Sequence, residues 1–260
     1  MKRLAFLLGI SAIACLGSPS EPQLTGPGRR VLFIGNSHTY VNDVPGLLQA
    51  LAAAGGESLA VASTTAANLA LIDHWNGGSA RADIARGGWE IVVLQQGWTP
   101  AGPCRDTLRL AARSFAGDAA KVGAKIAMYQ VWTQASRPAQ MPGTIRSYEL
   151  AAEDVSGLLF PAAAAFRAAL ARDPSLQLYG DDTHASPAGS YLAALVMYAT
   201  VFKRSPVGLP ASVQTLGGVR ITLPLTTATV LQEAAADVTI RGLGGSNGVD
   251  GPLIANPGSC

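Results

Sequence analysis

Hydrophobic residues gather in short runs that alternate with longer amphipathic stretches. Apolar runs bounded by Gly, Pro or polar residues predict buried strands, and apolar positions three or four residues apart predict helices. The predicted strands are 31–35, 59–62, 89–95, 125–132 and 157–161. The predicted helices are 44–54, 68–75, 107–122, 145–155, 162–172, 187–202 and 226–237. This alternation predicts βαβ units and a mostly parallel five-stranded sheet with helices on both faces.

The first predicted strand ends in a polar turn, where VLFIG runs directly into Asn36 and Ser37. Two later strands also end in polar residues, at 95–96 and 130–134. The carboxyl ends of parallel strands share one edge of a sheet, and ligands of open α/β sheets bind in the crevice at that edge. Ser37 is therefore a candidate nucleophile, provided that the chain supplies a base.

The chain contains three histidines that could serve as this base. His38 directly follows Ser37, and adjacent side chains on a turn usually diverge. His74 lies on a short predicted helix, where a packing or helix-end role is expected. His184 lies in a polar loop before a long apolar helix, and Asp181 could accept a hydrogen bond from its Nδ1–H while Nε2 faces Ser37. An ordinary capping loop is the alternative interpretation of this segment.

These two segments together resemble the SGNH (GDSL-like) hydrolase superfamily. The pattern GNSxT follows the first strand, and DxxH with Ser-Pro precedes the last large helix, so that the resemblance covers residues 31–201 in the expected order. It implies a flavodoxin-like three-layer α/β/α sandwich and a serine esterase that forms an acyl-enzyme. Ser37 corresponds to the nucleophile, His184 to the base and Asp181 to the acid that orients it.

The chain departs from this family in the two segments that bind the oxyanion. Ala66 stands where the second block has a glycine, whose backbone N–H is the expected donor. The third block, usually Gly-x-Asn-Asp, is replaced by LQQG at 94–97. A glutamine amide can donate the same hydrogen bond as asparagine, and Gln95 directly ends the strand, so it is preferred to Gln96. The resemblance thus implies an oxyanion hole formed by the N–H groups of Ser37 and Ala66 and the Gln95 amide.

Two tryptophans, Trp98 and Trp132, follow strand ends on the same edge of the predicted sheet. They are either buried aromatic residues or platforms on which a sugar ring stacks. By analogy with branches of the superfamily, such platforms in an exported hydrolase indicate an ester substrate, either a small molecule or a carbohydrate carrying O-acetyl groups. No metal and no cofactor is expected.

Two alternatives to an esterase deserve testing. The GNSH turn also resembles that of metal-dependent phosphoesterases, but such sites need several His and Asp ligands, and the chain has three histidines and no His-x-His motif. The departures in the oxyanion segments also fit an exported glycan-binding protein that has lost its activity. A fluorophosphonate probe would separate the esterase from the binding protein, since it should label Ser37 only in the former.

Composition and charge indicate one domain, at residues 31–240, that does not bind nucleic acid. Of the 260 residues 48% are hydrophobic, 14% are charged, and the net charge is +2. Lys2 and Arg3 precede a short apolar segment, and residues 1–17 are therefore expected to be an export signal. Residues 12–14 fit a signal peptidase site, while 13–15 resemble a lipobox that would attach a lipid anchor to Cys15.

Export places the protein in the periplasm, outside the cell or at the bacterial cell envelope. Residues 18–30 are predicted to be a tether, and the glycine-rich stretch 241–260 a C-terminal tail. In an oxidising compartment Cys104 and Cys260 could form a disulfide, for which intact thiols under non-reducing alkylation would be counter-evidence. The oligomeric state is not predicted by any feature of the sequence.

Overall fold

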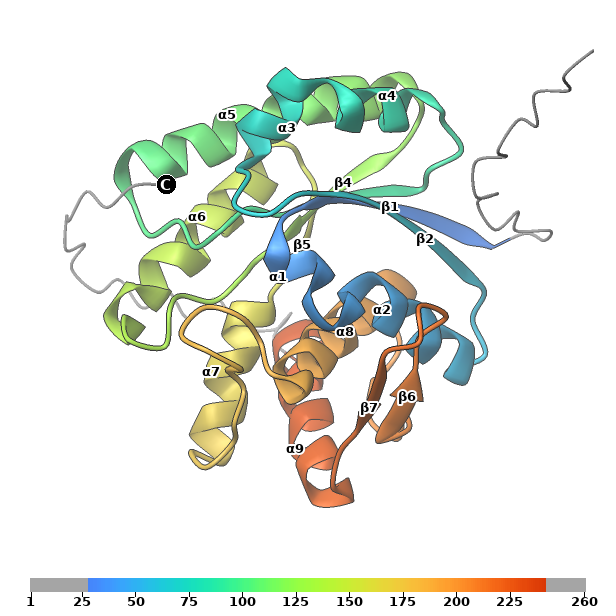
Figure 1. Cartoon of the computed structure of the whole chain (residues 1–260), viewed down its shortest axis with the longest axis vertical. Coiled ribbons are helices and arrows are strands. Elements are labelled where there is room, and N and C mark those ends of the chain that lie inside the picture. Colours follow the sequence, from blue (N-terminus) through green and yellow to red (C-terminus); the bar gives the residue numbers. More distant parts are fainter. Residues whose placement is uncertain (1–27, 242–260) are drawn as a thin grey trace, which may run out of the picture.

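A computed structural model describes residues 28–241, with a five-stranded parallel sheet at its centre. The strand order is β2-β1-β3-β4-β5 (Figure 1). The chain moves from β1 outward to β2 and then returns to the other side of β1 with β3, which creates a topological switch point between β1 and β3. The strands are β1 Arg29–Gly35, β2 Leu59–Thr65, β3 Ile91–Leu94, β4 Lys125–Tyr129 and β5 Leu158–Phe160.

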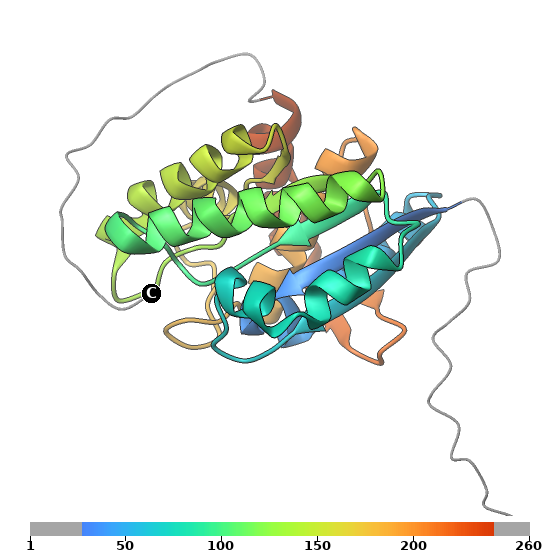
Figure 2. The same ribbon diagram turned by 90° about the horizontal axis from the view of Figure 1, so that it is seen from above.

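Helices cover both faces of this sheet, and the predicted three-layer α/β/α fold is confirmed (Figures 1 and 2). One layer contains α3 Leu71–Gly77, α4 Ser79–Ala85, α5 Gly102–Lys121 and α6 Met141–Asp154. The other contains α2 Val44–Ala54, α7 Ala162–Arg172, α8 Pro187–Phe202 and α9 Leu225–Ala236. The hairpin of β6 Ser212–Gln214 and β7 Arg220–Thr222 lies beside α2. Short helical segments are α1 Ser37–Tyr40, η1 Val41–Asp43, η2 Pro138–Gln140 and the π-helix η3 Asp237–Arg241.

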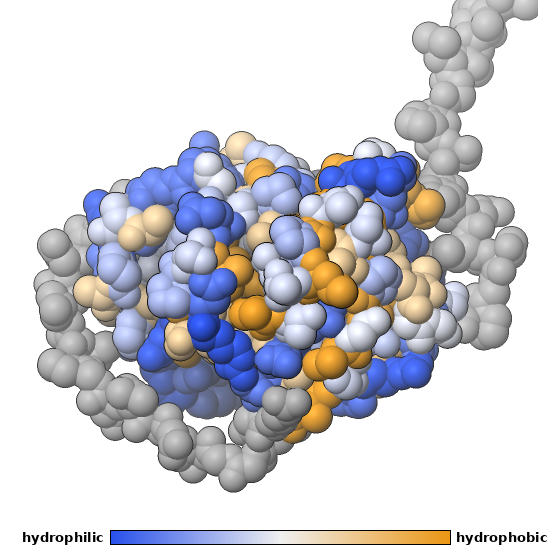
Figure 3. Space-filling model, turned by 90° about the horizontal axis from the view of Figure 1, so that it is seen from below, coloured by the Kyte–Doolittle hydropathy of each residue, from blue (hydrophilic) through white to orange (hydrophobic). Residues whose placement is uncertain are grey.

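Burial explains why the central strands and α8 are apolar on every side. β1 has sheet neighbours on both edges and helices on both faces, and its residues Val31 to Ile34 are at most 1% exposed. α8 contacts α2, α7 and α9, so nearly all of its residues are buried. On the side that carries α9 and the β6–β7 hairpin, hydrophobic residues are scattered among polar ones (Figure 3).

The structure differs from the predicted elements in several places. α5 begins at Gly102, five residues before the predicted helix 107–122, because Pro103 occupies the first turn, where proline needs no N–H donor. α4 and the β6–β7 hairpin were not predicted. β4 ends at Tyr129 rather than at 132. β1 begins at Arg29, inside the predicted tether.

Several sequence-based expectations lie outside the described residues: the export signal, Cys15, most of the tether, the tail and Cys260. Cys104 is buried in the first turn of α5, and its pairing with Cys260 stays a prediction. Within residues 28–241, no helix combines the length and apolarity that a membrane span requires.

Candidate active site

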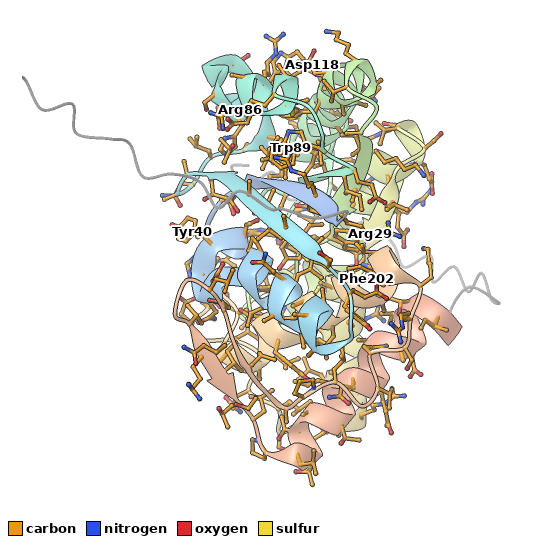
Figure 4. The ribbon with its side chains drawn as sticks, turned by 90° about the vertical axis from the view of Figure 1, so that its right-hand side faces the viewer. Arg29, Tyr40, Arg86, Trp89, Asp118 and Phe202 are labelled. Atoms are coloured by element: carbon orange, nitrogen blue, oxygen red, sulfur yellow. The ribbon has the colours of Figure 1, made fainter. Side chains whose placement is uncertain are left out.

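β1 runs across the molecule, and the candidate nucleophile Ser37 lies just beyond its carboxyl end. Arg29 at its start lies beside the Phe202 ring, with 5.6 Å from the guanidinium carbon to the ring centroid. Tyr40, 44% exposed, lies on the opposite side (Figure 4). Between them, β1 ends at Gly35 and α1 begins at Ser37. We call residues 35–40 the nucleophile turn; it lies at the carboxyl end of β1, next to the switch point.

The structure brings Ser37, His184 and Asp181 together in one hydrogen-bonded chain. His184 Nε2 lies 2.9 Å from Ser37 Oγ, and His184 Nδ1 lies 2.8 Å from Asp181 Oδ2. Asp181 Oδ1 accepts hydrogen bonds from the backbone N–H groups of Thr183 and His184, both at 2.6 Å. This is the geometry in which an imidazole, oriented by a carboxylate, can take the proton of a serine hydroxyl.

Asp181 is ionised, because it is open to solvent and because its carboxylate accepts hydrogen bonds. Its side chain is 59% exposed. The backbone N–H of His184 contributes most to lowering the pKa of Asp181 far below its ordinary value, followed by the His184 imidazole and the N–H of Thr183. Asp181 is therefore a carboxylate at any working pH, able to hold the His184 Nδ1 proton.

Residues 180–186, which we call the base loop, are fastened to the segment after β4. The Trp132 indole N–H donates to Thr183 O at 2.9 Å, and the N–H of Ala135 donates to Asp182 O at 2.8 Å. The backbone N–H and hydroxyl of Ser136 donate to the Asp182 carboxylate at 2.8 and 2.9 Å. These hydrogen bonds fix the position of the base loop, which is exposed and gains little support from packing.

Gln95 braces the nucleophile turn from inside the protein. Its Oε1 accepts hydrogen bonds from the Asn36 N–H at 2.9 Å and the Thr39 hydroxyl at 2.7 Å, and its Nε2 donates to Asn36 Oδ1 at 2.8 Å. A Cβ on Gly35 would lie 2.4 Å from Gln95 Oε1, so this close approach requires glycine. Gln95 is 0% exposed, so its amide does not face the solvent beside Ser37.

The predicted oxyanion hole is therefore wrong in two of its three members. The Gln95 amide is buried and bonded to Asn36. The Ala66 N–H donates to Gly35 O at 3.1 Å. The alternative, Gln96, is also bonded elsewhere, to the Leu71 N–H and the Thr99 hydroxyl. Ser37 is the first residue of α1, so no bond within that helix uses its N–H.

The two tryptophans differ in their surroundings. Trp132 is 0% exposed and stacks on Phe166, with ring centroids 4.1 Å apart and planes inclined by 9°. Its predicted role as a sugar platform is wrong, because no face of the ring is accessible. Trp98 is half-buried, and its role in substrate binding stays a prediction.

The other two histidines are buried side chains. His74, on α3, is buried with Nε2 2.9 Å from Gly35 O, as expected of a packing residue. His38 is 5% exposed, and its ring centroid lies 5.9 Å from that of His184. Burial, with a smaller contribution from His184, lowers the pKa of His38 to about 4. The sequence gives no signal for this packing of His38 against the candidate base.

The described residues contain no cluster of three or more His, Cys, Asp or Glu side chains placed to hold a metal ion. The site that the structure does assemble consists of Ser37, His184 and Asp181, with Gln95 and Asn36 behind the serine.

No protein-family model and no curated protein matches the chain. Among solved structures, the chain is similar to a DUF4886 family protein from Bacteroides uniformis, with a TM-score of 0.70 and 16% identity over 83% of this chain and 96% of that one. A proposed SGNH hydrolase from Slackia heliotrinireducens has a TM-score of 0.57 and 28% identity, over 67% and 100%. An acetyl xylan esterase has a TM-score of 0.54 and 16% identity, over 66% and 99%.

The fold and the serine, histidine and aspartate at the ends of its elements define an α/β protein with a hydrolase-type site. The likeness to the Slackia protein, at 28% identity, confirms the prediction of the SGNH/GDSL-like hydrolase superfamily, and the other two likenesses show the fold.

Proposed function

We propose that the protein is an exported serine esterase that acts through Ser37, His184 and Asp181. The observation that carries this proposal is the unbroken chain of hydrogen bonds from Ser37 Oγ through the His184 imidazole to Asp181, at 2.9 and 2.8 Å. A hydroxyl, an imidazole and a carboxylate in this sequence are the parts that nucleophilic acyl transfer needs.

The reaction proceeds in two halves. Ser37 Oγ attacks the ester carbonyl carbon while its proton passes to His184 Nε2, and the N–H of Ser37 donates to the oxyanion. His184 then returns the proton to the departing alcohol as the C–O bond breaks, which leaves the acyl group on Ser37. A water molecule, deprotonated by His184, attacks the acyl carbon; the bond from that carbon to Ser37 Oγ then breaks, His184 returns the proton to Oγ, and the acid is released. Asp181 stabilises the imidazolium in both halves.

The proposed substrates are acetyl esters, on small molecules or on carbohydrates. Support comes from the likeness to an acetyl xylan esterase and from the half-buried Trp98 after β3. The site itself needs no cofactor for this chemistry. Export is proposed from the first 17 residues, with a lipid anchor at Cys15 as one of its two routes. Secretion of the full chain, with radiolabelled palmitate to detect the anchor, tests this part separately.

Replacement of the nucleophile tests the activity. Ser37→Ala should lower hydrolysis of p-nitrophenyl acetate on the order of a thousand-fold or more, and should abolish labelling by a fluorophosphonate probe. Ser114→Ala is the control, because the Ser114 hydroxyl is exposed and bonds only its own helix, at Leu110 O. A wild-type protein that neither hydrolyses the ester nor reacts with the probe would instead be the non-catalytic glycan-binding protein.

The substrate class is tested with acetylated xylo-oligosaccharides. Release of acetate at a higher kcat/KM than from p-nitrophenyl acetate would support a carbohydrate ester. If p-nitrophenyl acetate is the better substrate and Trp98→Ala leaves both rates unchanged, the carbohydrate part of the proposal is wrong.

A further inference from the structure

Asn42 connects the chain segment that carries the nucleophile to the segment that carries the base. It lies in η1, the short helical segment that follows α1, five positions after Ser37. Its amide Nδ2 donates two hydrogen bonds, to Ala185 O at 3.1 Å and to Ser190 Oγ at 3.0 Å. Ala185 is the neighbour of His184, and Ser190 lies in the first turns of α8, directly after the base loop. The Asn42 side chain thus bonds one residue of the base loop and one residue of α8.

The backbone aims this amide. Asn42 has φ 57° and ψ 17°, in the left-handed region, and Asp43 follows with φ 54° and ψ 56°. Asparagine tolerates this region better than most residues with a side chain. Asp43 accepts a hydrogen bond from the Gly46 N–H and so caps α2. The two left-handed residues turn the chain sharply between α1 and α2, and α2 in turn packs on α8.

The base loop needs such a support on the Ser37 side. Its bonds to Trp132, Ala135 and Ser136 reach it from the segment after β4. The side chain of His184 is 31% exposed and that of Asp181 59% exposed, so packing does little to fix how far the imidazole lies from Ser37. A displacement of 1 Å at a reacting centre can lower the rate about a hundred-fold.

We infer that Asn42 is a positioning residue that sets the distance between Ser37 Oγ and His184 Nε2. It touches neither substrate nor the reacting atoms, and acts by holding Ala185 and Ser190 against the nucleophile segment. The inference rests on the proposed function, in which His184 takes the proton of Ser37.

Asn42→Gly tests this inference, since glycine keeps the left-handed backbone and removes both hydrogen bonds. We expect kcat for p-nitrophenyl acetate to fall about 10- to 100-fold, with KM within about 3-fold of the wild type. Asn42→Asp keeps the shape of the side chain but turns an acceptor toward Ala185 O, and should lower kcat at least as much. Lys203→Gly is the matched control: Lys203 is exposed, left-handed at φ 55°, and caps the other end of α8. It should leave kcat within about 2-fold.

A second readout separates this inference from the proposed function. Labelled histidine gives NMR signals from three residues in distinct surroundings, His38, His74 and His184. Asn42→Gly should shift or broaden the His184 signals and leave those of His74 in place. Unchanged His184 signals, or a lower melting temperature with unchanged kcat per folded molecule, would overturn the inference. If the wild type has no esterase activity, the proposed function fails while the NMR result still decides the role of Asn42.

Discussion

The nucleophile turn and the base loop contribute to the same hydrogen-bonded chain, yet they differ in burial. In the nucleophile turn, Asn36 and His38 are 6% and 5% exposed and Thr39 is 0% exposed, with Gln95 fully buried behind them. In the base loop, Asp181 is exposed, and its carboxylate bonds residues two and three positions further along the same loop. One half of the site is therefore part of the core, and the other is a surface loop.

The two halves are therefore held in place by different interactions, buried hydrogen bonds in one and solvent-exposed hydrogen bonds in the other. A buried polar group that loses its partner costs about 1–3 kcal/mol, whereas an exposed one can bond water instead. Changes in the nucleophile turn should therefore lower stability and activity together. Changes to Asp181 or His184 in the base loop should lower activity and leave the fold intact.

Asp181→Asn should give the largest loss of activity without loss of stability. The amide can keep an acceptor toward the N–H groups of Thr183 and His184, but it then presents a donor to His184 Nδ1 and favours the wrong tautomer. We expect kcat for p-nitrophenyl acetate to fall on the order of 1,000- to 10,000-fold, with an unchanged melting temperature.

Asp182→Asn is the matched control for this change, because Asp182 is the adjacent carboxylate and bonds Ser136 instead of His184. Its kcat should stay within a few-fold of the wild type. Asp181→Ala should lose less activity than Asp181→Asn, since water can enter beside an exposed position. A melting temperature that falls sharply in either Asp181 variant would contradict the view that the base loop is independent of the core.

Gln95→Leu should lower both stability and activity. Leucine leaves the Asn36 N–H, Asn36 Oδ1 and the Thr39 hydroxyl without their buried partner, at a cost on the order of 2–4 kcal/mol in free energy of unfolding. The nucleophile turn loses its brace, and kcat should fall about 10- to 100-fold. Urea unfolding and ester hydrolysis measure the two effects.

Gln96→Leu is the comparison, since the Gln96 amide is also buried but bonds Leu71 and Thr99. It should lower stability by a similar amount and kcat much less. If Gln95→Leu were to lower kcat more than 100-fold at constant stability, Gln95 would be an oxyanion donor after all, and the hydrogen bonds to Asn36 would not describe the active state.

The same contrast explains which parts of the site could be predicted. The order of strands and helices follows from apolar runs and their spacing, and Asp181 and His184 are three residues apart in one loop, so their contact is local. Ser37 could be found because a strand that ends in a polar turn places its last residues at a known edge.

The contacts of Gln95, Trp132 and Asn42 could not be found in this way. Gln95 Oε1 reaches Asn36 across 59 positions, and Asn42 reaches Ala185 across 143. A glutamine at a strand end looks the same in the sequence whether its amide faces solvent or the neighbouring turn. Trp132 was placed at the correct edge, but only its stacking on Phe166 reveals that the ring is buried.

The smallest predicted effect concerns His38, which should make the stability of the nucleophile turn depend on pH. Burial lowers the pKa of His38 from 6.5 to about 4 in the folded protein. Between these values the unfolded chain binds a proton that the folded chain does not, so stability falls as the pH is lowered from 6.5 to 4 and is regained as it rises. The difference between the two pKa values corresponds to on the order of 3 kcal/mol. Asp181 stays charged in the folded protein, but the unfolded chain begins to protonate it near pH 5, so it adds a slope below about pH 5 that is the same in the wild type and in a His38 variant.

His38→Gln should therefore flatten the stability curve between pH 4 and 6.5, measured by urea unfolding at several pH values. His74→Gln should flatten it less, because the hydrogen bond of His74 to Gly35 O partly offsets the effect of burial on its pKa. Carboxylates with lowered pKa values, such as Asp118 and Asp154, begin to lose their contribution only below about pH 5 and do so equally in both proteins, so the difference between pH 5 and 6.5 reports His38. Equal slopes in the wild type and His38→Gln would mean that His38 reaches solvent, and that the nucleophile turn is as open as the base loop.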